Sequence, residues 1–188
     1  MKQQKFKKLI TTKRLNLKPI EPSFEFANLL YDEISHNRDF FKFMPFALVK
    51  KPEEEYDFLV SGKQNAESGK AVSYAMFLKN TNEFVGMVSV HSISWKRESG
   101  EFGAWVCKKF AHQGFATEGT KALEAYFFQM GFHKLSAKAN IKNKASCGTL
   151  KKLGLTKDGI ERDATFNKQM QEWESFAVFS KLSSEYKK

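Results

Sequence analysis

The feature that most constrains the fold is a change of hydrophobic period near the middle of the chain. Apolar residues alternate with polar ones over 72–78 and 84–90, with a turn at 80–82 between them, and again over 101–106. After this point, apolar residues recur at helical spacing: Phe115, Gly119, Ala122, Leu123, Tyr126, Phe127 and Met130. Alternation places successive side chains on opposite faces of a strand, whereas a spacing of three or four defines one face of a helix. The sequence therefore predicts a β-hairpin, a third strand and then a helix.

Shorter patterns on both sides complete the predicted order of elements. Before the hairpin we expect a strand over 11–18, a helix over 22–34, a loop or short helix over 40–45, and a second helix that begins at Pro52 with three glutamates in its first turn. After the long helix we expect a strand over 135–139, a helix over 145–153 stopped by Gly154, and further strands, the last over 173–182. This order predicts an α/β fold: one mixed sheet with helices on its faces, in a single domain that spans residues 1–188.

Composition limits the class of protein. The chain has 188 residues, of which 41% are hydrophobic and 28% charged, as is typical of a globular domain with a core of its own. No apolar run approaches the roughly 20 residues that cross a bilayer, and the basic first eight residues lead into no apolar signal segment. Cys107 and Cys147 have no metal-type spacing and predict reduced thiols in the cytoplasm. The four scattered histidines offer no ligand set, so we expect no metal.

The net charge of +10 is spread unevenly along the chain. Residues 21–57 hold nine acidic and four basic side chains, whereas residues 125–157 hold seven lysines and no acidic residue. Solvated surface lysines explain part of this excess. The segregation favours a phosphate-bearing partner near the C-terminal half and a cationic partner near the N-terminal half.

The segment over 101–118 carries the most chemical information. A strand is followed by a basic loop, and Gly114 then stands directly before a helix. The first N–H groups of a helix have no partner within it, so they form a ready site for phosphate oxygens, and a glycine lets the backbone approach such a ligand closely. A single glycine before a helix is also a common chain reversal. The spacing matches neither a P-loop nor a dinucleotide-binding fingerprint.

A second polar segment adds to this signal. Residues 140–146 place asparagine, lysine and serine at the end of a strand and the start of a helix, and Leu-Lys-Lys-Leu-Gly-Leu follows over 150–155. Together the two segments resemble the GNAT acetyltransferase superfamily, in particular its RimJ/RimL type, which acetylates ribosomal-protein N-termini and related amines. The resemblance covers nearly the whole chain, through motifs at 12–18, 84–88, 101–106, 114–119, 143–146, 153–155 and 161–163.

The resemblance implies an acetyl-CoA-dependent N-acetyltransferase. In this family the sheet is mostly antiparallel and splays after the strand that corresponds to 101–106, and acetyl-CoA lies in the resulting cleft. The cofactor-binding residues that it implies are Trp105 and Val106, whose strand pairs with the pantetheine arm, Asn143, which contacts the pantetheine, and the pyrophosphate-binding turn of His112, Gln113, Gly114, Phe115, Ala116 and Thr117. The lysine-rich segment that follows would lie near the 3′-phosphate end.

The chain departs from the family pattern at the start of this turn. Ala111 stands where the family usually has Arg or Gln, and His112 stands where it usually has Gly. Backbone N–H groups provide most of the phosphate contacts, so Ala111 is tolerable. His112 carries a Cβ that restricts the backbone, and it either adds a cation to the site or weakens binding.

Acetyl transfer to an amine needs a neutral nucleophile, a group that polarises the thioester carbonyl and an acid for the leaving thiolate. Glu101 is the candidate base or an anchor for a cationic acceptor, and Ser146 is the candidate donor to the thiolate. A backbone N–H near Val106 would stabilise the developing oxyanion. The alternatives are a solvent-facing strand glutamate and a serine that satisfies the first turn of a helix.

Other residues are weaker candidates. Cys147 has no histidine close to it in sequence and is expected inside a helix, and Cys107 is expected in the core. His91 and Trp95 either line the acceptor cleft or pack. The aromatic segment over 40–46 is expected to belong partly to the core and partly to an acceptor pocket.

Two other functions stay open on the sequence alone. The protein could keep this fold but not catalyse acetyl transfer, and it would then be a non-catalytic acyl-CoA-binding or regulatory module. The departures from the family pattern at Ala111 and His112 permit this alternative. The charge of +10 also suggests nucleic-acid binding, but the lysines form no recognisable nucleic-acid-binding motif, so neither nucleic acid nor membrane is expected as a partner. The acceptor is a protein N-terminus, a polyamine or another small amine, which the sequence does not rank, and we expect a monomer or homodimer.

Overall fold

The computed structural model describes residues 5–44 and 48–186. Eight strands form one sheet in the order β1-β2-β3-β4-β5-β6-β8-β7. The strands are β1 (Ile10–Thr11), β2 (Leu15–Pro19), β3 (Val72–Leu78), β4 (Phe84–Ser94), β5 (Ser99–Val106), β6 (Lys134–Asn140), β7 (Thr156–Asn167) and β8 (Glu172–Leu182). The helices are α1 (Phe24–Ser35), α2 (Pro52–Glu67), α3 (Phe115–Gln129) and α4 (Lys144–Lys152).

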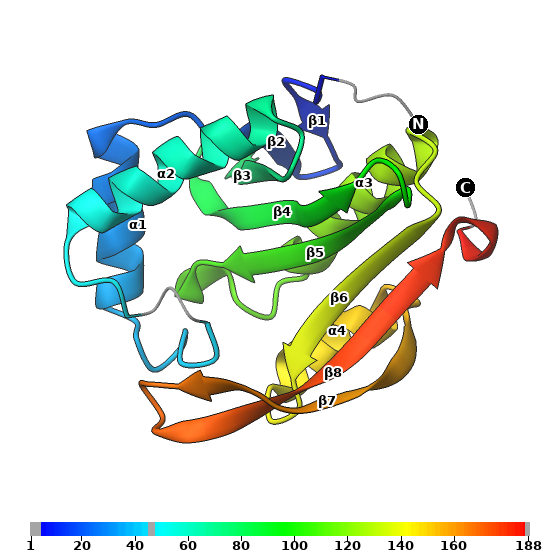
Figure 1. Ribbon diagram of the computed structural model, residues 1–188. Helices are drawn as coiled ribbons and strands as arrows, with labels where there is room; N and C mark the ends of the chain where they lie inside the picture. The colour runs from blue at the N-terminus through cyan, green and yellow to red at the C-terminus, as the bar shows by residue number, and fades with distance from the viewer. Residues whose placement is uncertain (1–4, 45–47, 187–188) are drawn as a thin grey trace.

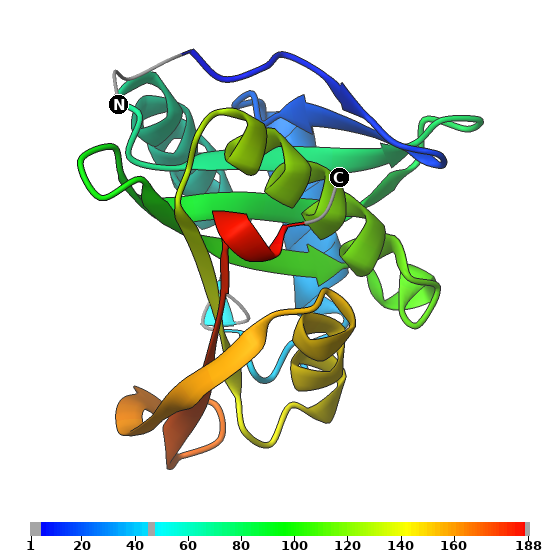
Figure 2. The same cartoon turned by 90° about the vertical axis from the view of Figure 1, so that its right-hand side faces the viewer.

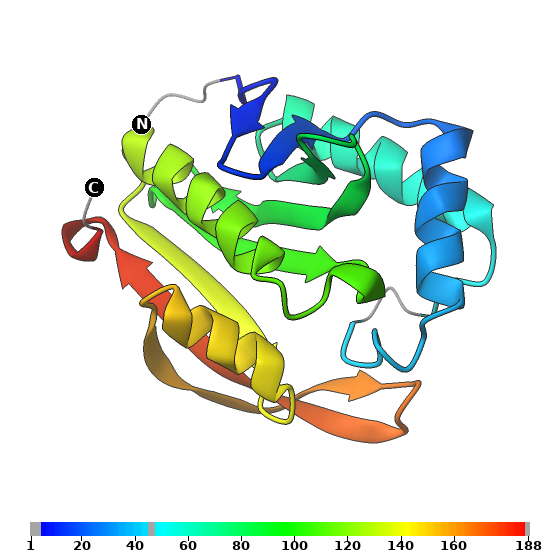
Figure 3. The same ribbon diagram turned by 180° about the vertical axis from the view of Figure 1, so that it is seen from behind.

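Every strand pair is antiparallel except β5–β6, which is parallel. Helices α1 and α2 cover one face of the sheet, and α3 and α4 cover the other (Figures 1 and 3). The predicted fold class, a mixed and mostly antiparallel sheet between helices, is therefore confirmed.

The predicted elements occur with small shifts at their ends, and one difference has a clear cause. The strand expected over 11–18 is divided into β1 and β2, because a turn closes where the Thr12 amide donates to the Leu15 carbonyl (2.9 Å). Residues 40–44 form turns and no helix, and Pro45 to Ala47 lie outside the described residues. Strand β7 is exposed along almost its whole length, so it lacks the apolar alternation that would have set its bounds in the sequence.

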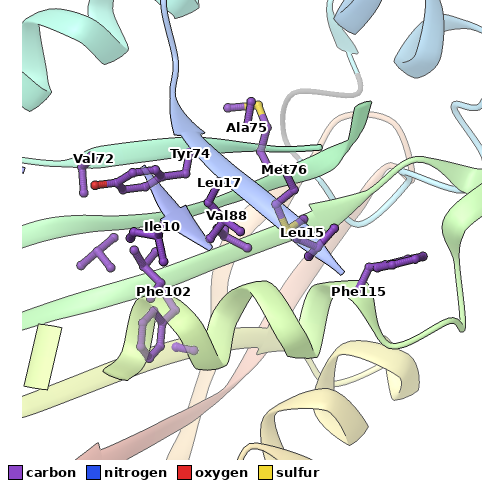
Figure 4. Packing of buried hydrophobic residues seen from close by; sticks show 14 of the residues in the cluster. Ile10, Leu15, Leu17, Val72, Tyr74, Ala75, Met76, Val88, Phe102 and Phe115 are labelled. Carbon is purple, nitrogen blue, oxygen red and sulfur yellow. The ribbon is translucent and has the colours of Figure 1, made fainter. Parts of the chain in front are cut away.

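The core lies mainly between the sheet and α3. Leu15, Leu17 and Val88 are completely or almost completely buried, and Figure 4 shows them packed with their neighbours on the side of the sheet that faces α3. Gly119 allows α3 to approach the sheet closely, since a Cβ there would stand 2.4 Å from the Met76 sulfur. This close packing sets the position of the helix N-terminus that the sequence singles out.

Parallel pairing between β5 and β6 covers only part of the two strands. The register runs from Ser99↔Lys134 to Phe102↔Ala137, although β5 continues to Val106 and β6 to Asn140. Figure 1 shows the two strands diverging beyond this point. The sheet therefore splays at the strand for which the family resemblance predicted it.

Candidate active site

The two faces of β5 have different environments. Phe102 is buried in the main core, whereas Trp105 contacts Phe41, which follows α1, edge-to-face with ring centroids 5.5 Å apart. Because side chains alternate along a strand, Glu101 and Gly103 lie on the same face as Trp105, toward α1 and α2. This agrees with the alternation predicted over 101–106.

Glu101 lies where the β5–β6 pairing is about to end. It is opposite His91 of β4 and beside Ser136 of β6, and it is half-buried. Lys138, two residues further along β6, pairs with Glu161 of β7 (3.0 Å). The hydrogen bond that Lys138 donates to the Glu161 carboxylate raises the pKa of Lys138, and the charge of Glu101 adds to this increase. A carboxylate, an imidazole and an ammonium group thus share one face of the sheet at its splay.

The turn before α3 has the open geometry that a phosphate site requires. Gly114 caps the helix in the left-handed region (φ 80°), and no side chain of the described residues caps it. The Glu118 amide makes the first bond of the helix, to the Gly114 carbonyl (2.9 Å), so the N–H groups of residues 115–117 precede the helical ladder. His112, Gln113 and Gly114 are exposed.

His112 adopts a backbone conformation that favours glycine. Its φ is 61°, in the left-handed region that a Cβ makes unfavourable. The sequence expectation that a histidine restricts the backbone at this position therefore has a physical basis. His112 keeps the turn that glycine would form, at a conformational cost.

The second predicted segment forms the start of α4. Asn143 is the N-cap, and its Oδ1 accepts a hydrogen bond from the Ser146 amide (3.0 Å). Ser146 is half-buried in the first turn, and its hydroxyl makes no hydrogen bond to any described residue. Asn143 therefore has a structural role in addition to the predicted contact with pantetheine.

Glu101 and Ser146 belong to opposite sides of the sheet. Helix α4 lies beside α3 on the second face (Figures 2 and 3), whereas Glu101 is on the first. The region where β5 and β6 lose their pairing connects the two faces. The roles assigned to these residues and to the cofactor-binding residues stay predictions.

The weaker candidates have structural roles. Trp95 donates to the Gly69 carbonyl (2.8 Å) and packs against Phe132, and Cys107 is buried. Burial raises the pKa of the Cys107 thiol to about 12, which leaves it protonated. The Cys147 thiol, within α4, donates to the Asn140 carbonyl (3.6 Å). The Cys107 thiol therefore lacks the environment of a nucleophile.

Sequence reasoning missed the residues that tether the turn from a distance. Arg14, which precedes β2, pairs with Glu118 of α3 (2.6 Å) and donates to the Gln113 carbonyl (3.1 Å). About a hundred residues separate these partners, and no local pattern connects them. In the sequence, the motif at 12–18 is informative only as part of the family resemblance.

The described ranges, residues 5–44 and 48–186, lack two further features. They contain no group of three or more His, Cys, Asp or Glu side chains arranged to hold a metal ion. None of their helices is long and apolar enough to cross a membrane. A groove of about 680 Å³ lies between α1 and strands β2 and β3, but none of the predicted site residues lines it.

Comparison with known proteins defines the class. Residues 14–156 match the model of the acetyltransferase (GNAT) domain. The chain therefore belongs to the GNAT family and is an acetyltransferase, with acetyl-CoA as its acetyl donor. The predicted family is confirmed.

Two proteins from Bacillus species are similar to this chain in sequence. The chain is 25% identical over 176 residues to the uncharacterized N-acetyltransferase p20 of Bacillus licheniformis, which covers 93% of this chain and 96% of that protein. It is 26% identical over 94 residues to the uncharacterized N-acetyltransferase YoaA of Bacillus subtilis, a match that spans 50% of this chain and 53% of that protein.

Solved structures show the same fold at low identity. The ribosomal L7/L12 alpha-N-protein acetyltransferase RimL, in complex with coenzyme A, superposes with a TM-score of 0.84 at 18% identity and covers 93% of this chain and 97% of that one. The microcin C7 self-immunity acetyltransferase MccE, in complex with acetyl-CoA and AMP, superposes with a TM-score of 0.81 at 21% identity and covers 91% of this chain and 93% of that one. The structural likeness thus includes the RimJ/RimL type.

Proposed function

We propose that this acetyltransferase transfers the acetyl group to a primary amine, a protein N-terminus or a small cationic amine, by direct attack within a ternary complex. The observation that carries this proposal is the end of the β5–β6 pairing at Phe102↔Ala137. There the half-buried carboxylate of Glu101 faces one side of the sheet. The open N-terminus of α3 comes shortly after this strand in the sequence. Residues 1–188 form one domain in this proposal.

The open turn fits the phosphates of acetyl-CoA. The N–H groups of residues 115–117 lie outside the helical ladder, and the helix dipole favours an anion at this end. Among the described residues, the part of β5 beyond Phe102 has no ladder partner on its β6 side, so it has room for an extended amide-bearing chain beside Val106. Acetyl-CoA, when bound, supplies an activated thioester.

Glu101 accepts a proton from the acceptor ammonium, directly or through water, so that the amine can attack as a neutral nucleophile. The acceptor enters from the α1–α2 face, where Glu101 lies beside His91 and within reach of the charge of Lys138. Ser146 approaches from α4 on the other face, and its hydroxyl donates to the departing thiolate. Positioning of the two substrates supplies most of the rate increase.

The type of acceptor is proposed from the structural relatives and from the charges near Glu101. RimL acts on a ribosomal-protein N-terminus, and a basic protein terminus suits a site whose proton acceptor is a carboxylate. The alternation of Glu101, Lys138 and Glu161 gives this face both signs of charge, so an acceptor with one cationic and one anionic group also fits. Two free cysteines support a reducing, cytoplasmic location.

Thiol release from acetyl-CoA against a panel of amines and peptide N-termini tests the proposal. We expect turnover with at least one acceptor and a loss of about 10²–10⁴-fold in kcat for Glu101→Gln, with the Kd of acetyl-CoA unchanged. Ser146→Ala is expected to lower kcat without changing the pH at which the rate rises. The matched controls, Glu67→Gln and Ser61→Ala, change exposed side chains on α2 and are expected to behave as the wild type.

Full activity of Glu101→Gln would remove the proton-acceptor role. Tight acetyl-CoA binding without turnover on any amine would instead favour the non-catalytic acyl-CoA-binding module.

A further inference from the structure

The guanidinium group of Arg14 lies against the turn that precedes α3. Its Nε contacts the Glu118 Oε2 (2.6 Å), and its Nη1 donates to the Gln113 carbonyl (3.1 Å). Its Cζ stands 4.0 Å from the centre of the Phe115 ring. Three contacts from different directions therefore fix the orientation of this side chain.

The partner carboxylate is itself held in place. The Thr12 hydroxyl (2.6 Å) and the Arg14 amide (2.8 Å) both donate to the Glu118 Oε1. Burial acts to raise the pKa of Glu118, but the hydrogen bonds from Thr12 and Arg14 outweigh it and hold the pKa below its usual value. The carboxylate is therefore ionised at neutral pH and orients the guanidinium permanently.

The third guanidinium nitrogen of Arg14, Nη2, is not used by these contacts. Nη2 makes no hydrogen bond to any described residue, and it stands 3.7 Å from the point where a Cβ on Gly114 would lie. It is thus beside the residue that opens the turn. Arginine presents its N–H groups as a rigid fork that matches phosphate oxygens, so a nitrogen oriented in this way is a phosphate donor without further rearrangement.

We infer that Arg14 binds the pyrophosphate of acetyl-CoA through Nη2, an inference that rests on the proposed placement of the phosphates at this turn. The turn begins with Ala111, which carries no charge. Lys109 pairs with Glu83, the residue before β4. Arg14 therefore brings a guanidinium group to the turn from the start of the chain. Because Glu118 neutralises part of its charge, the contribution of Arg14 is a directed hydrogen bond more than a net positive field.

Calorimetry on the full chain with CoA, 3′-dephospho-CoA and pantetheine tests this assignment. We expect Arg14→Gln to raise the Kd of CoA and of 3′-dephospho-CoA by the same factor, about 10- to 100-fold for the loss of a charge-assisted hydrogen bond. Pantetheine has no phosphates, so its Kd is expected to stay the same. The control Lys13→Gln removes the same charge from the adjacent exposed residue and is expected to change none of the three.

Arg14→Gln also leaves the Glu118 carboxylate without its partner, so folding needs its own control. The double variant Arg14→Gln/Glu118→Gln removes both charges, and its thermal unfolding is measured beside the binding. We expect the double variant to fold and to show the same selective loss toward the two phosphate-bearing ligands. If Arg14→Gln alone fails to fold, the double variant supplies the result.

The other outcomes contradict the inference in distinct ways. An equal loss for pantetheine would make Arg14 a purely structural residue, and a loss for CoA alone would assign it to the 3′-phosphate. An unchanged Kd for all three ligands would also overturn the inference while leaving the proposed function intact. Failure of the wild type to bind CoA would overturn both, whereas CoA binding without acetyl transfer would contradict only the proposed function.

Discussion

Single residues decide how the phosphate turn is built. Gly114 (φ 80°) and His112 (φ 61°) both occupy the left-handed region, but only glycine does so without a steric cost. A non-glycine residue there costs roughly 1–2 kcal/mol. Contacts around the turn offset this conformational cost, because Arg14 donates a hydrogen bond to the carbonyl of Gln113, which lies between these two residues. The sequence showed the substitution at His112, but only the backbone angle shows that the left-handed conformation is kept.

Glu55 gives a prediction at the same scale. It lies in the first turn of α2, but its side chain is 3% exposed and its Oε1 has no hydrogen-bond partner among the described residues. Burial, with a smaller effect from the charge of Glu54, raises the pKa of Glu55 from 4.5 to about 7. A carboxyl whose pKa is higher in the folded state binds more protons when folded, so the free energy of unfolding falls as the pH rises from about 4.5 through 7.

We therefore expect Glu55→Gln to be more stable than the wild type at pH 8, by up to about 3 kcal/mol, and the difference to shrink at pH 5. Urea unfolding at the two pH values measures it. Glu53→Gln, an exposed residue of the same turn, is the control, for which we expect no such pH-dependent gain. A constant difference between Glu55→Gln and the wild type across this pH range would show that Glu55 titrates normally.

At the scale of elements, a buried ion pair joins α3, α4 and β8. The ammonium group of Lys181 in β8 contacts the Glu124 carboxylate of α3 (2.6 Å) and donates to the Leu153 carbonyl at the end of α4 (2.5 Å). Both side chains are almost inaccessible, at 11% and 4% exposed. This contact holds α4, which carries Ser146, against the rest of the second face.

Lys181→Met is expected to destabilise the protein by about 3–5 kcal/mol, because it leaves the Glu124 charge buried and unpaired. The double variant Lys181→Met/Glu124→Leu is expected to regain most of this loss, since it removes both charges and keeps the volume. Denaturant unfolding of Lys181→Met, Glu124→Leu and the double variant gives the coupling energy between the two side chains. A loss below about 1 kcal/mol for Lys181→Met would show that the pair behaves as a solvated surface pair.

At the scale of the whole molecule, contacts across the splay connect the loop after α1 to the β7–β8 hairpin. Asn167 at the end of β7 donates to the Lys42 carbonyl (3.0 Å) and to the buried Glu174 carboxylate (2.8 Å). Gln169 donates to the Arg38 carbonyl (3.3 Å). The two parts of the sheet that separate at β5 and β6 are thus joined again on the α1–α2 side, where the proposed acceptor enters.

Asn167→Ala is expected to lower the free energy of unfolding by about 1–3 kcal/mol, because Glu174 loses one of its donors while it stays buried. Hydrogen exchange is expected to become faster in residues 38–44 and to stay unchanged in β3. Lys168→Ala, the exposed neighbour, is the control. Unchanged exchange over 38–44 would mean that other contacts hold this loop.

The distribution of charge also changes meaning at this scale. In the sequence, residues 125–157 contain seven lysines and no acidic residue. In the fold, Lys134, Lys138 and Lys142 pair with Asp158, Glu161 and Glu172 of β7 and β8. The segregated charge is therefore partly neutralised by strands that come later in the chain, and it is weaker evidence for a phosphate-bearing partner than the sequence suggests.

The sequence by itself determined the elements whose signal is local. The change from alternation to helical spacing predicted β3, β4, β5 and α3, because the period of buried side chains follows directly from backbone geometry. Pro52 and Gly154 marked the start and end of helices, since each residue restricts or frees the backbone where it stands. Gly114 before α3 predicted the open turn for the same reason.

Only the tertiary structure decided which distant residues meet. The pairing of Arg14 with Glu118, the burial of Glu55 among three adjacent glutamates, and the bond from Asn167 to Lys42 depend on how the elements pack. The exposed β7 had no apolar pattern to reveal its bounds, because an edge strand needs only its ladder to β8. Local periodicity reports a residue's own backbone and exposure, whereas a contact between segments a hundred residues apart is a property of the packed sheet and its helices.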